Sequence, residues 1–238
     1  MNVEVIYVGA SSGVRAAYDA TREVPIVGVD LETDPLASRM IASLARPGGN
    51  LTGFFLDLPE FSAKRLELLK EALPTVSRVL VLWDSSLDPA PLSRLDSAAH
   101  ALKLRLTKSE VRTLADIENA FQAAADRKAQ AVLIMQSPTL DAYKDQILEF
   151  GRKHRLPVFA VFADFAVGGA VLSYGPNVLD MIARATTYVD KILRGARPGD
   201  LPIQRPAKFD LFVNLKAAKS LGLSITNSVL VRADEVIH

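Results

Sequence analysis

Short apolar runs alternate with amphipathic stretches from the first residues of the chain onward. Residues 3–8 and 25–29 are rich in valine and isoleucine and predict β-strands, the first ending at Gly9. Between them, residues 12–22 show helical spacing, and Ser11 or Ser12 is the predicted N-cap. The chain therefore opens with a strand–helix–strand unit.

The same alternation continues to the end of the chain. Further extended segments are predicted at residues 51–58, 78–83, 105–111, 131–135, 157–162, 170–174 and 209–214, and further helices at 36–44, 61–72, 92–102, 113–127, 140–154, 178–194 and 215–221. Residues 79–82 and 131–135 are continuous apolar runs, which is typical of parallel strands covered by helices on both faces. Repeated units of this kind predict an α/β fold with doubly wound parallel sheets.

The order of the elements predicts two lobes, each with its own sheet. One series ends with the long helix at 61–72, and a new strand–helix series opens at residue 78. We therefore expect the boundary at residues 74–78, with 1–75 plus about 177–238 in an N-lobe and 76–176 in a C-lobe. Two extended stretches that contain proline, residues 52–59 and 173–176, are the predicted crossings between the lobes.

Composition and charge narrow the classes of function. Of the 238 residues, 49% are hydrophobic and 23% are charged, which is enough for a well-covered core. The net charge is 28 − 27 = +1, so the chain lacks the basic surface that nucleic acids or anionic membranes require. The densest basic run, residues 152–155, fits the last turn of a helix, where cations interact favourably with the helix dipole.

Three further absences in the sequence are informative. There is no cysteine, which excludes disulfides, thiolate metal sites and cysteine nucleophiles. No apolar stretch approaches the roughly 20 residues that span a bilayer, and the first residues do not form a signal peptide.

Several motifs in fixed order resemble a known family. They are DP at 34–35, SLARPGGNLTG at 43–53, KRLELL at 64–69, SYGP at 173–176, KFDLFVNLK at 208–216 and ADEVI at 233–237. Together they resemble the tryptophan/tyrosine-binding-like family of ABC transporter substrate-binding proteins, over essentially the whole chain. The resemblance implies a type I periplasmic binding fold, in which two doubly wound lobes hold a ligand in the cleft between them and close on it about a hinge.

The resemblance also implies partners and a location. Such proteins pass a small solute to an ABC permease in the membrane, and the family's ligands are aromatic amino acids and related small carboxylates. The implied location is the periplasm, or a lipid-anchored position outside the cytoplasm. No cofactor and no nucleic acid are expected.

The chain departs from this family at its start. Family members begin with a signal peptide and two strand–helix units before the strand that matches residues 3–8. In the usual strand order 2-1-3-4-5, the loss of those units makes residues 3–8 an edge strand with unpaired backbone groups. We therefore expect either a truncated first lobe or self-association of two chains through this edge.

Candidate ligand contacts follow the strands, because ligands of open α/β sheets bind at the carboxyl ends of the strands. In the first lobe these are Ala10, Ser11 and Ser12, where backbone N–H groups and hydroxyls at a helix start suit a carboxylate, although the serines also fit simple caps. Asp34 suits an ammonium group or starts a turn before proline. Phe55 lies on a predicted crossing and suits either the cleft or hinge packing.

The second lobe supplies five more candidates. Trp83 and Asp84 lie at the end of one apolar strand and Ser137 follows another, and Trp83 either stacks on an aromatic ligand or covers the core. Asp164 is a second candidate for an ammonium group, next to Phe162 and Phe165, which fit the core equally well. Tyr174 lies on the second predicted crossing.

Motifs for other functions are missing from the sequence. The three histidines are scattered without metal-ligand spacing, and there is no G-x-S-x-G elbow, P-loop or G-x-G-x-x-G fingerprint. The leading hypothesis is a solute-binding component of an ABC importer and not an enzyme. A truncated or regulatory remnant with impaired binding is the alternative, and an α/β enzyme is the weaker one.

Overall fold

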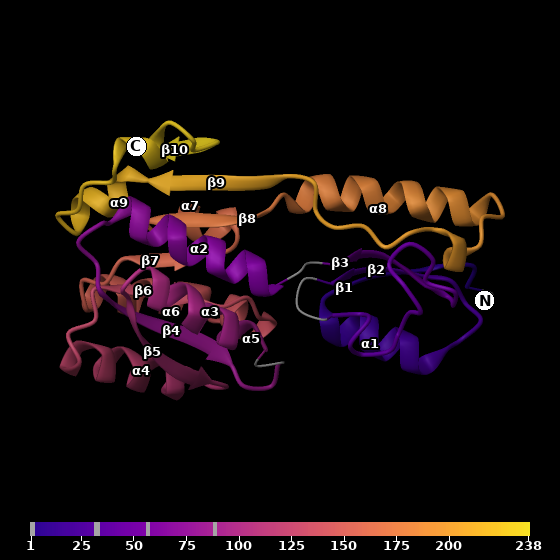
Figure 1. The fold of residues 1–238 in the computed structure, drawn as a ribbon, viewed down its shortest axis with the longest axis horizontal. Coiled ribbons are helices and arrows are strands. Elements are labelled where there is room, and N and C mark those ends of the chain that lie inside the picture. Colours follow the sequence, from indigo (N-terminus) through magenta and orange to yellow (C-terminus); the bar gives the residue numbers. More distant parts are fainter. Residues whose placement is uncertain (1–2, 31–33, 56–57, 88–89) are drawn as a thin grey trace. The chain divides into compact units, whose positions relative to one another are not determined.

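The computed structural model describes residues 3–30, 34–55, 58–87 and 90–238 (Figure 1). The chain forms two compact units, and it passes between them three times along the sequence. Unit 1 contains Met1–Leu58 and Pro176–Lys208, and unit 2 contains Pro59–Gly175 and Phe209–His238.

Unit 1 is built on a small parallel sheet. Its strands β1 (Ile6–Gly9), β2 (Ile26–Asp30) and β3 (Leu51–Phe55) lie in the order β1-β2-β3. The strand β1 is therefore an edge strand of this sheet, as expected for residues 3–8. The helices are α1 (Ser11–Ala20) and α8 (Val178–Leu193), followed by a single 3₁₀ turn, Pro198–Asp200.

The two helices of unit 1 cover opposite faces of its sheet. Neighbouring residues of a strand point to opposite faces. Phe55 of β3 lies in a buried cluster with Val14 of α1, whereas Phe54 contacts Tyr188 of α8 with ring centroids 5.5 Å apart. The Tyr188 hydroxyl also donates to the carbonyl of Pro202 at 2.7 Å, which fixes the chain that follows α8.

Unit 2 is built on a seven-stranded sheet with the order β10-β9-β8-β7-β6-β4-β5. The strands are β4 (Arg78–Asp84), β5 (Arg105–Val111), β6 (Ala131–Ile134), β7 (Val158–Ala160), β8 (Leu172–Pro176), β9 (Phe209–Asn214) and β10 (Glu235–Ile237). Strands β4 to β8 are parallel. The strand β9 runs antiparallel to β8, since residue 214 bonds to 171 and residue 208 bonds to 177.

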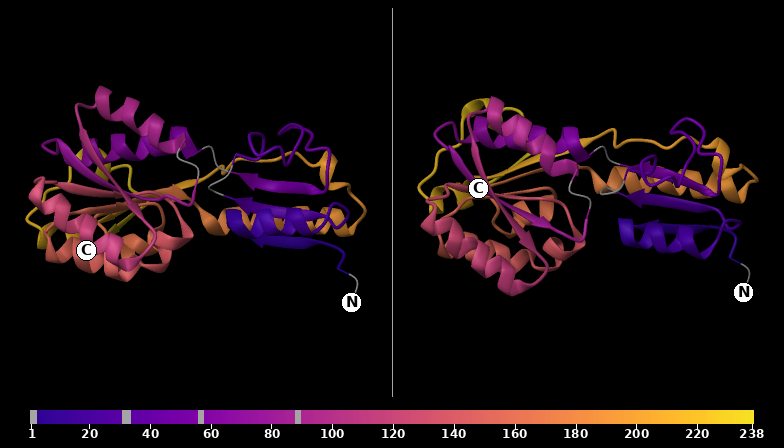
Figure 2. Two further views of the ribbon diagram at one scale, coloured as in Figure 1. Left: turned by 90° about the horizontal axis from the view of Figure 1, so that it is seen from below. Right: turned by 60° about the horizontal axis from the view of Figure 1, so that its bottom comes forward.

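Helices cover both faces of the unit 2 sheet, as Figure 2 shows. They are α2 (Leu58–Ala72), α3 (Ala90–Ala101), α4 (Leu114–Asp126), α5 (Pro138–Ala142), α6 (Lys144–Lys153), α7 (Ala163–Gly168), α9 (Leu215–Ser220) and α10 (Asn227–Leu230). Val79 and Val81 of β4 pack with α2 and α3, and Leu80 and Leu82 pack with α4 and α6. Residues 79–83 of this strand are all apolar, because both faces of the strand are covered.

The helix ends follow the sequence signals in unit 2. Thr113 caps α4 in a capping box with Asp116, whose side chain accepts from the Thr113 backbone N–H at 2.9 Å. Arg152 and Lys153 lie in the last turn of α6, as the basic run at 152–155 indicated.

The predicted helix at residues 36–44 is wrong. Residues 35–39 form turns instead, because the Asp34 carboxylate accepts from the N–H groups of Leu36 and Ala37 at 2.8 and 3.1 Å. Arg39 then takes a positive φ of 57°, which stops a helix from propagating.

The division into units differs from the expected lobes at both ends of unit 2. The helix α2, expected in the N-lobe, belongs to unit 2, because Leu66 and Leu69 pack with Val79 and Val81 of β4. Residues 209–238 also belong to unit 2, since Val213 and Val229 lie in the same core cluster. The two predicted crossings contain the first two passages between units, and the third, at residues 208–209, was not predicted.

Candidate functional site

Two predicted ligand contacts from different strands meet in unit 2. Asp84 ends β4, and Ser137 is the N-cap of α5 just after β6, the neighbouring strand. Both side chains are buried. The Asp84 carboxylate accepts from the backbone N–H and the hydroxyl of Ser86, at 2.9 and 2.6 Å. The Ser137 hydroxyl accepts from the Leu140 N–H at 3.0 Å.

The surroundings of Asp84 keep its carboxylate ionised. Burial acts to raise its pKa, but hydrogen bonds from Ser86, Thr139 and Ser137 outweigh burial, so the pKa is lowered from its usual value. The carboxyl end of β4 therefore carries a fixed negative charge.

An aromatic cluster lies at the same end of the sheet, beside β8. Phe61 of α2 and Tyr174 of β8 are stacked with ring centroids 5.8 Å apart, and Tyr174 stacks on Phe209 of β9 at 5.6 Å. Phe61 and Phe209 are 5.7 Å apart. Burial raises the pKa of Tyr174, so its hydroxyl stays neutral and remains a donor at physiological pH.

Trp83 lies on the same face of the sheet as Tyr174. Both are half-buried and pack against the core cluster that contains residues of α2 and α3. In strand order, β6 and β7 separate β4 from β8, so the two aromatic side chains lie on either side of the end of β6. Each of these two residues therefore keeps part of its surface exposed.

Arg65 of α2 reaches the end of β6. Its Nη2 donates to the carbonyl oxygen of Ile134, the last residue of that strand, at 2.5 Å. The side chain is 3% exposed, and its guanidinium carbon lies 5.6 Å from the centre of the Phe61 ring. A buried cation therefore lies beside the aromatic cluster.

Asp164 is tied to a neighbour at the surface. Its carboxylate pairs with the Lys144 ammonium at 2.8 Å, and 58% of its side chain is exposed. The hydrogen bond from this pair raises the pKa of Lys144. Phe165 is buried in the core and Phe162 is half-buried.

In unit 1, the loop after β1 brings Ala10, Ser11 and Ser12 to the start of α1. The N-cap is Ala10, and no side chain caps the helix, so the predicted serine cap is wrong. The serines instead occupy the first helical positions, and Ala10 takes φ 61° and ψ 150°, a conformation that L-residues rarely adopt. The first turn of α1 contains no acidic residue to compete for its N–H groups.

The remaining two candidates, Asp34 and Phe55, have contacts that a turn and the core explain. The Asp34 carboxylate accepts the two turn N–H groups described above, which matches its alternative as a turn starter. Phe55 is 3% exposed in the unit 1 core. Asp30, which ends β2 and is fully buried, is a strand-end carboxylate that the sequence did not single out.

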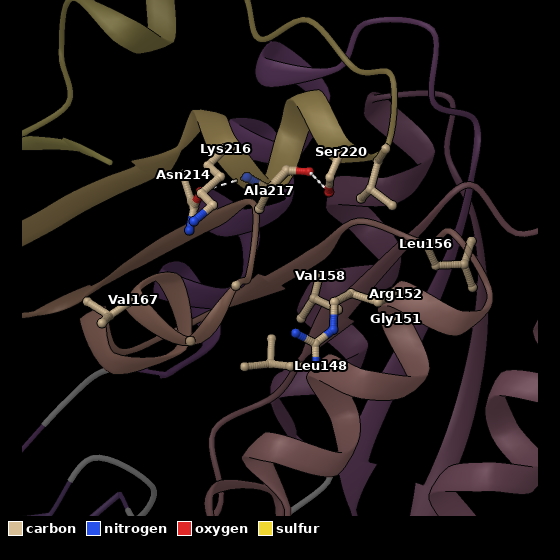
Figure 3. A pocket seen from close by; sticks show the side chains of 13 residues that line it. Leu148, Gly151, Arg152, Leu156, Val158, Val167, Asn214, Lys216, Ala217 and Ser220 are labelled. Atoms are coloured by element: carbon tan, nitrogen blue, oxygen red, sulfur yellow. Dashed lines mark hydrogen bonds between the residues drawn. The ribbon is translucent and has the colours of Figure 1, made fainter. Parts of the chain in front are cut away.

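A separate hollow lies at the opposite end of the parallel strands of unit 2, where β7 begins. It has a volume of about 270 Å³ and lies where α6 and α7 end and α9 begins, near the start of β7 (Figure 3). Its walls include Leu148, Val158 and Val167, and the cations Arg152 and Lys216 are at its rim. Asn214 closes one side, where its side-chain N–H donates to the carbonyl of Ala166 and its side-chain oxygen accepts from the N–H of Ala217.

No group of three or more His, Cys, Asp or Glu side chains suits a metal ion in the part of the chain that the structure describes. Among the same residues, no helix is both long and apolar enough to cross a membrane.

Comparison with known proteins identifies the family. Residues 1–237 match the family described as ABC transporter substrate binding protein. The chain belongs to this family.

Relatives of this ABC transporter substrate-binding protein include the tyrosine-binding protein of Clostridioides difficile. The two are 22% identical over 98% of this chain and 68% of the relative. A conserved domain protein of Vibrio cholerae has a solved structure that is 28% identical, with a TM-score of 0.89 over 99% of this chain and 79% of that one. A Streptococcus pneumoniae ABC domain solved with L-Trp is 22% identical, with a TM-score of 0.87 over 98% and 81% of the two chains.

These matches show the fold of type I periplasmic binding proteins, as the motifs implied. The self-association expected through β1 receives no support from them. The sequence analysis also did not single out α2 as part of the candidate site. Its signal was an arginine in the apolar stripe of an amphipathic helix, since Phe61, Arg65 and Leu69 recur at intervals of four residues.

Proposed function

We propose that this substrate-binding protein is the solute-binding component of an ABC importer and binds an aromatic amino acid or a related small carboxylate. The observation that carries the proposal is the match to the family over residues 1–237. A relative is named a tyrosine-binding protein, and a structure of the same fold holds L-Trp. An aromatic amino acid needs an apolar wall for its ring and charged partners for its ends.

The unit 2 sheet edge offers such partners. Trp83 and Tyr174 supply partly exposed aromatic side chains. Asp84 supplies a fixed negative charge for an ammonium group, and Ser137 donates a hydrogen bond to its carboxylate. In unit 1, the uncapped start of α1 at Ala10, Ser11 and Ser12 supplies donors for oxygen atoms of the solute. Asp34, Phe55 and Asp164 are weaker members of the proposed site, because a turn, the core and a surface ion pair already account for them.

The proposed mechanism is closure of the two units on the solute. Two separately packed units joined by three chain passages are typical of hinge proteins. A ligand that contacts both units favours the closed state by its difference in affinity for the two states. Micromolar binding supplies about 8 kcal/mol, which is ample for this purpose.

The importer role implies further partners. The loaded protein passes its solute to an ABC permease, and it acts in the periplasm or at a lipid anchor outside the cytoplasm. Binding and release involve no covalent step, so we propose no enzymatic activity.

Thermal unfolding with a panel of solutes tests the proposal. L-tyrosine, L-tryptophan and phenyl carboxylates at 100 times their dissociation constant each add about 2.7 kcal/mol to the free energy of unfolding, and therefore raise the melting temperature. D-ribose serves as a control of unrelated chemistry. A chain whose melting temperature responds to none of these compounds is the impaired remnant and not an amino-acid receptor.

A further inference from the structure

Arg65 is a buried cation that has no counter-ion among the residues whose side chains the structure describes. One donor of its guanidinium bonds to the carbonyl of Ile134, and its Nε has no hydrogen-bond partner. None of the carboxylates whose side chains are described forms an ion pair with it, and burial alone accounts for its shifted pKa. Only 3% of the surface of Arg65 is exposed.

This arrangement is costly for the protein without ligand. Burial lowers the pKa of Arg65 to about 9, so the group still carries its charge at neutral pH. A buried charge destabilises the fold unless an opposite charge faces it. A neutral side chain at this position would avoid that cost, so the bond to one carbonyl does not explain the presence of an arginine.

The position of Arg65 fits a ligand contact. The guanidinium lies at the carboxyl end of β6, where ligands of α/β sheets bind. The strands that carry the two aromatic residues lie on either side of β6. The strand β4, which ends near Trp83, is the direct neighbour of β6 at about 5 Å, and β8, which contains Tyr174, is two strands away at about 10 Å. An aromatic solute held by either ring brings its polar end within reach of Arg65.

We infer that Arg65 binds the carboxylate of the solute and is the residue that makes the site specific for acids. The inference rests on the proposed function and adds the residue that pairs with the carboxylate of the solute. We assign this role to α2 and not to the start of α1. The free Nε–H and the remaining Nη–H groups form a planar fork that matches the two oxygens of a carboxylate. The arriving anion pairs the buried charge, so binding recovers the stability that the unliganded protein lacks.

The test compares L-tyrosine with tyramine, which has the same ring and ammonium group but no carboxylate. Calorimetric titration at pH 7 is expected to show that the natural chain prefers L-tyrosine by about 30-fold or more, as for other buried charge pairs. Arg65→Met is expected to reduce the preference to a few-fold, with tyramine affinity unchanged. The neighbouring, exposed Lys64 gives the matched control, since Lys64→Met is expected to keep the full preference.

Thermal unfolding without ligand separates this role from a structural one. Arg65→Met is expected to melt at the same temperature as the natural chain or higher, because it removes an unpaired buried charge. A lower melting temperature, with equal losses for both compounds, would make Arg65 a structural anchor of α2 and overturn the inference. Arg65→Lys, which keeps the charge but not the fork, provides a second variant, expected to bind L-tyrosine about 10-fold more weakly with tyramine unchanged.

The outcomes also separate this inference from the proposed function. If the natural chain binds L-tyrosine and tyramine equally well, or Arg65→Met keeps the preference, the inference is wrong and solute binding stands. If the natural chain binds none of L-tyrosine, tyramine, L-tryptophan and tryptamine, both the inference and the proposed amino-acid specificity are wrong.

Discussion

Asp84, at the end of β4, and Ser137, at the start of α5, take part in one buried hydrogen-bonded cluster. The cluster joins the turn after β4 to the helix after β6, because Ser86 and Thr139 also donate to the carboxylate. It therefore fixes two neighbouring loops at the sheet edge that carries the candidate site.

Replacing Asp84 tests how strongly this cluster holds the edge. Asp84→Asn removes the charge and turns one acceptor oxygen into a donor, which leaves a buried hydroxyl partner without an acceptor. We expect the free energy of unfolding to fall by about 1–3 kcal/mol, measured by urea denaturation. The control is Asp164→Asn, whose exposed ion pair with Lys144 contributes about 0–1 kcal/mol. Equal effects of the two variants would contradict the proposed importance of the Asp84 cluster.

The same carboxylate predicts a direction of pH dependence. The folded-state pKa of Asp84 lies below its unfolded value, which is about 3.9 for a free aspartate. The folded state therefore binds protons less readily, so the contribution of Asp84 to stability is complete above that unfolded pKa. It is lost as the pH falls through the lower folded pKa. Denaturation curves from pH 6 to pH 2 are expected to show a smaller acid-induced loss in Asp84→Asn than in the natural chain.

Trp83 is the only tryptophan of the chain, so its fluorescence reports directly on the proposed site. Trp83→Ala removes one aromatic surface, and we expect the affinity for L-tyrosine to fall about 10-fold, as for an aromatic residue at the centre of an interface. Calorimetry measures this variant, and the emission of Trp83 follows titration of the natural chain with L-tyrosine. Trp83→Phe, which keeps a ring, is the control and is expected to lose less. Unchanged affinity in Trp83→Ala would assign Trp83 to the core.

The sequence predicted the strands better than it predicted the boundaries between the units. Apolar runs such as residues 131–135 identify buried parallel strands because both faces must be covered, and this pattern is local. The assignment of α2 to unit 2 depends on contacts of Leu66 and Leu69 with β4 and with strands much later in the chain. No local pattern encodes such contacts.

The candidate site shows the same limit. Strand-end positions pointed to Asp84 and Ser137, and the structure brings these two together. The same reasoning could not separate Asp34, which forms its own turn, from a ligand contact, because a turn and a ligand use the same carboxylate oxygens. Arg65 lies within a helix, far from any strand end in sequence, and only the packing of α2 brings it to the end of β6.

Gly53 provides a test of the sheet in unit 1. It has φ of +135°, and a Cβ placed on it would lie 1.9 Å from the carbonyl oxygen of Gly28 in the neighbouring strand. Gly53→Ala therefore forces β2 and β3 apart in addition to straining the backbone, and we expect a loss of about 3 kcal/mol or more in the free energy of unfolding. Gly49→Ala, where a Cβ meets no atom within 4 Å, is the matched control and should change the stability by less than about 1 kcal/mol. Hydrogen exchange of β2 and β3 locates the effect, and a Gly53→Ala chain as protected there as the natural one would show that the close approach of the two strands is not required.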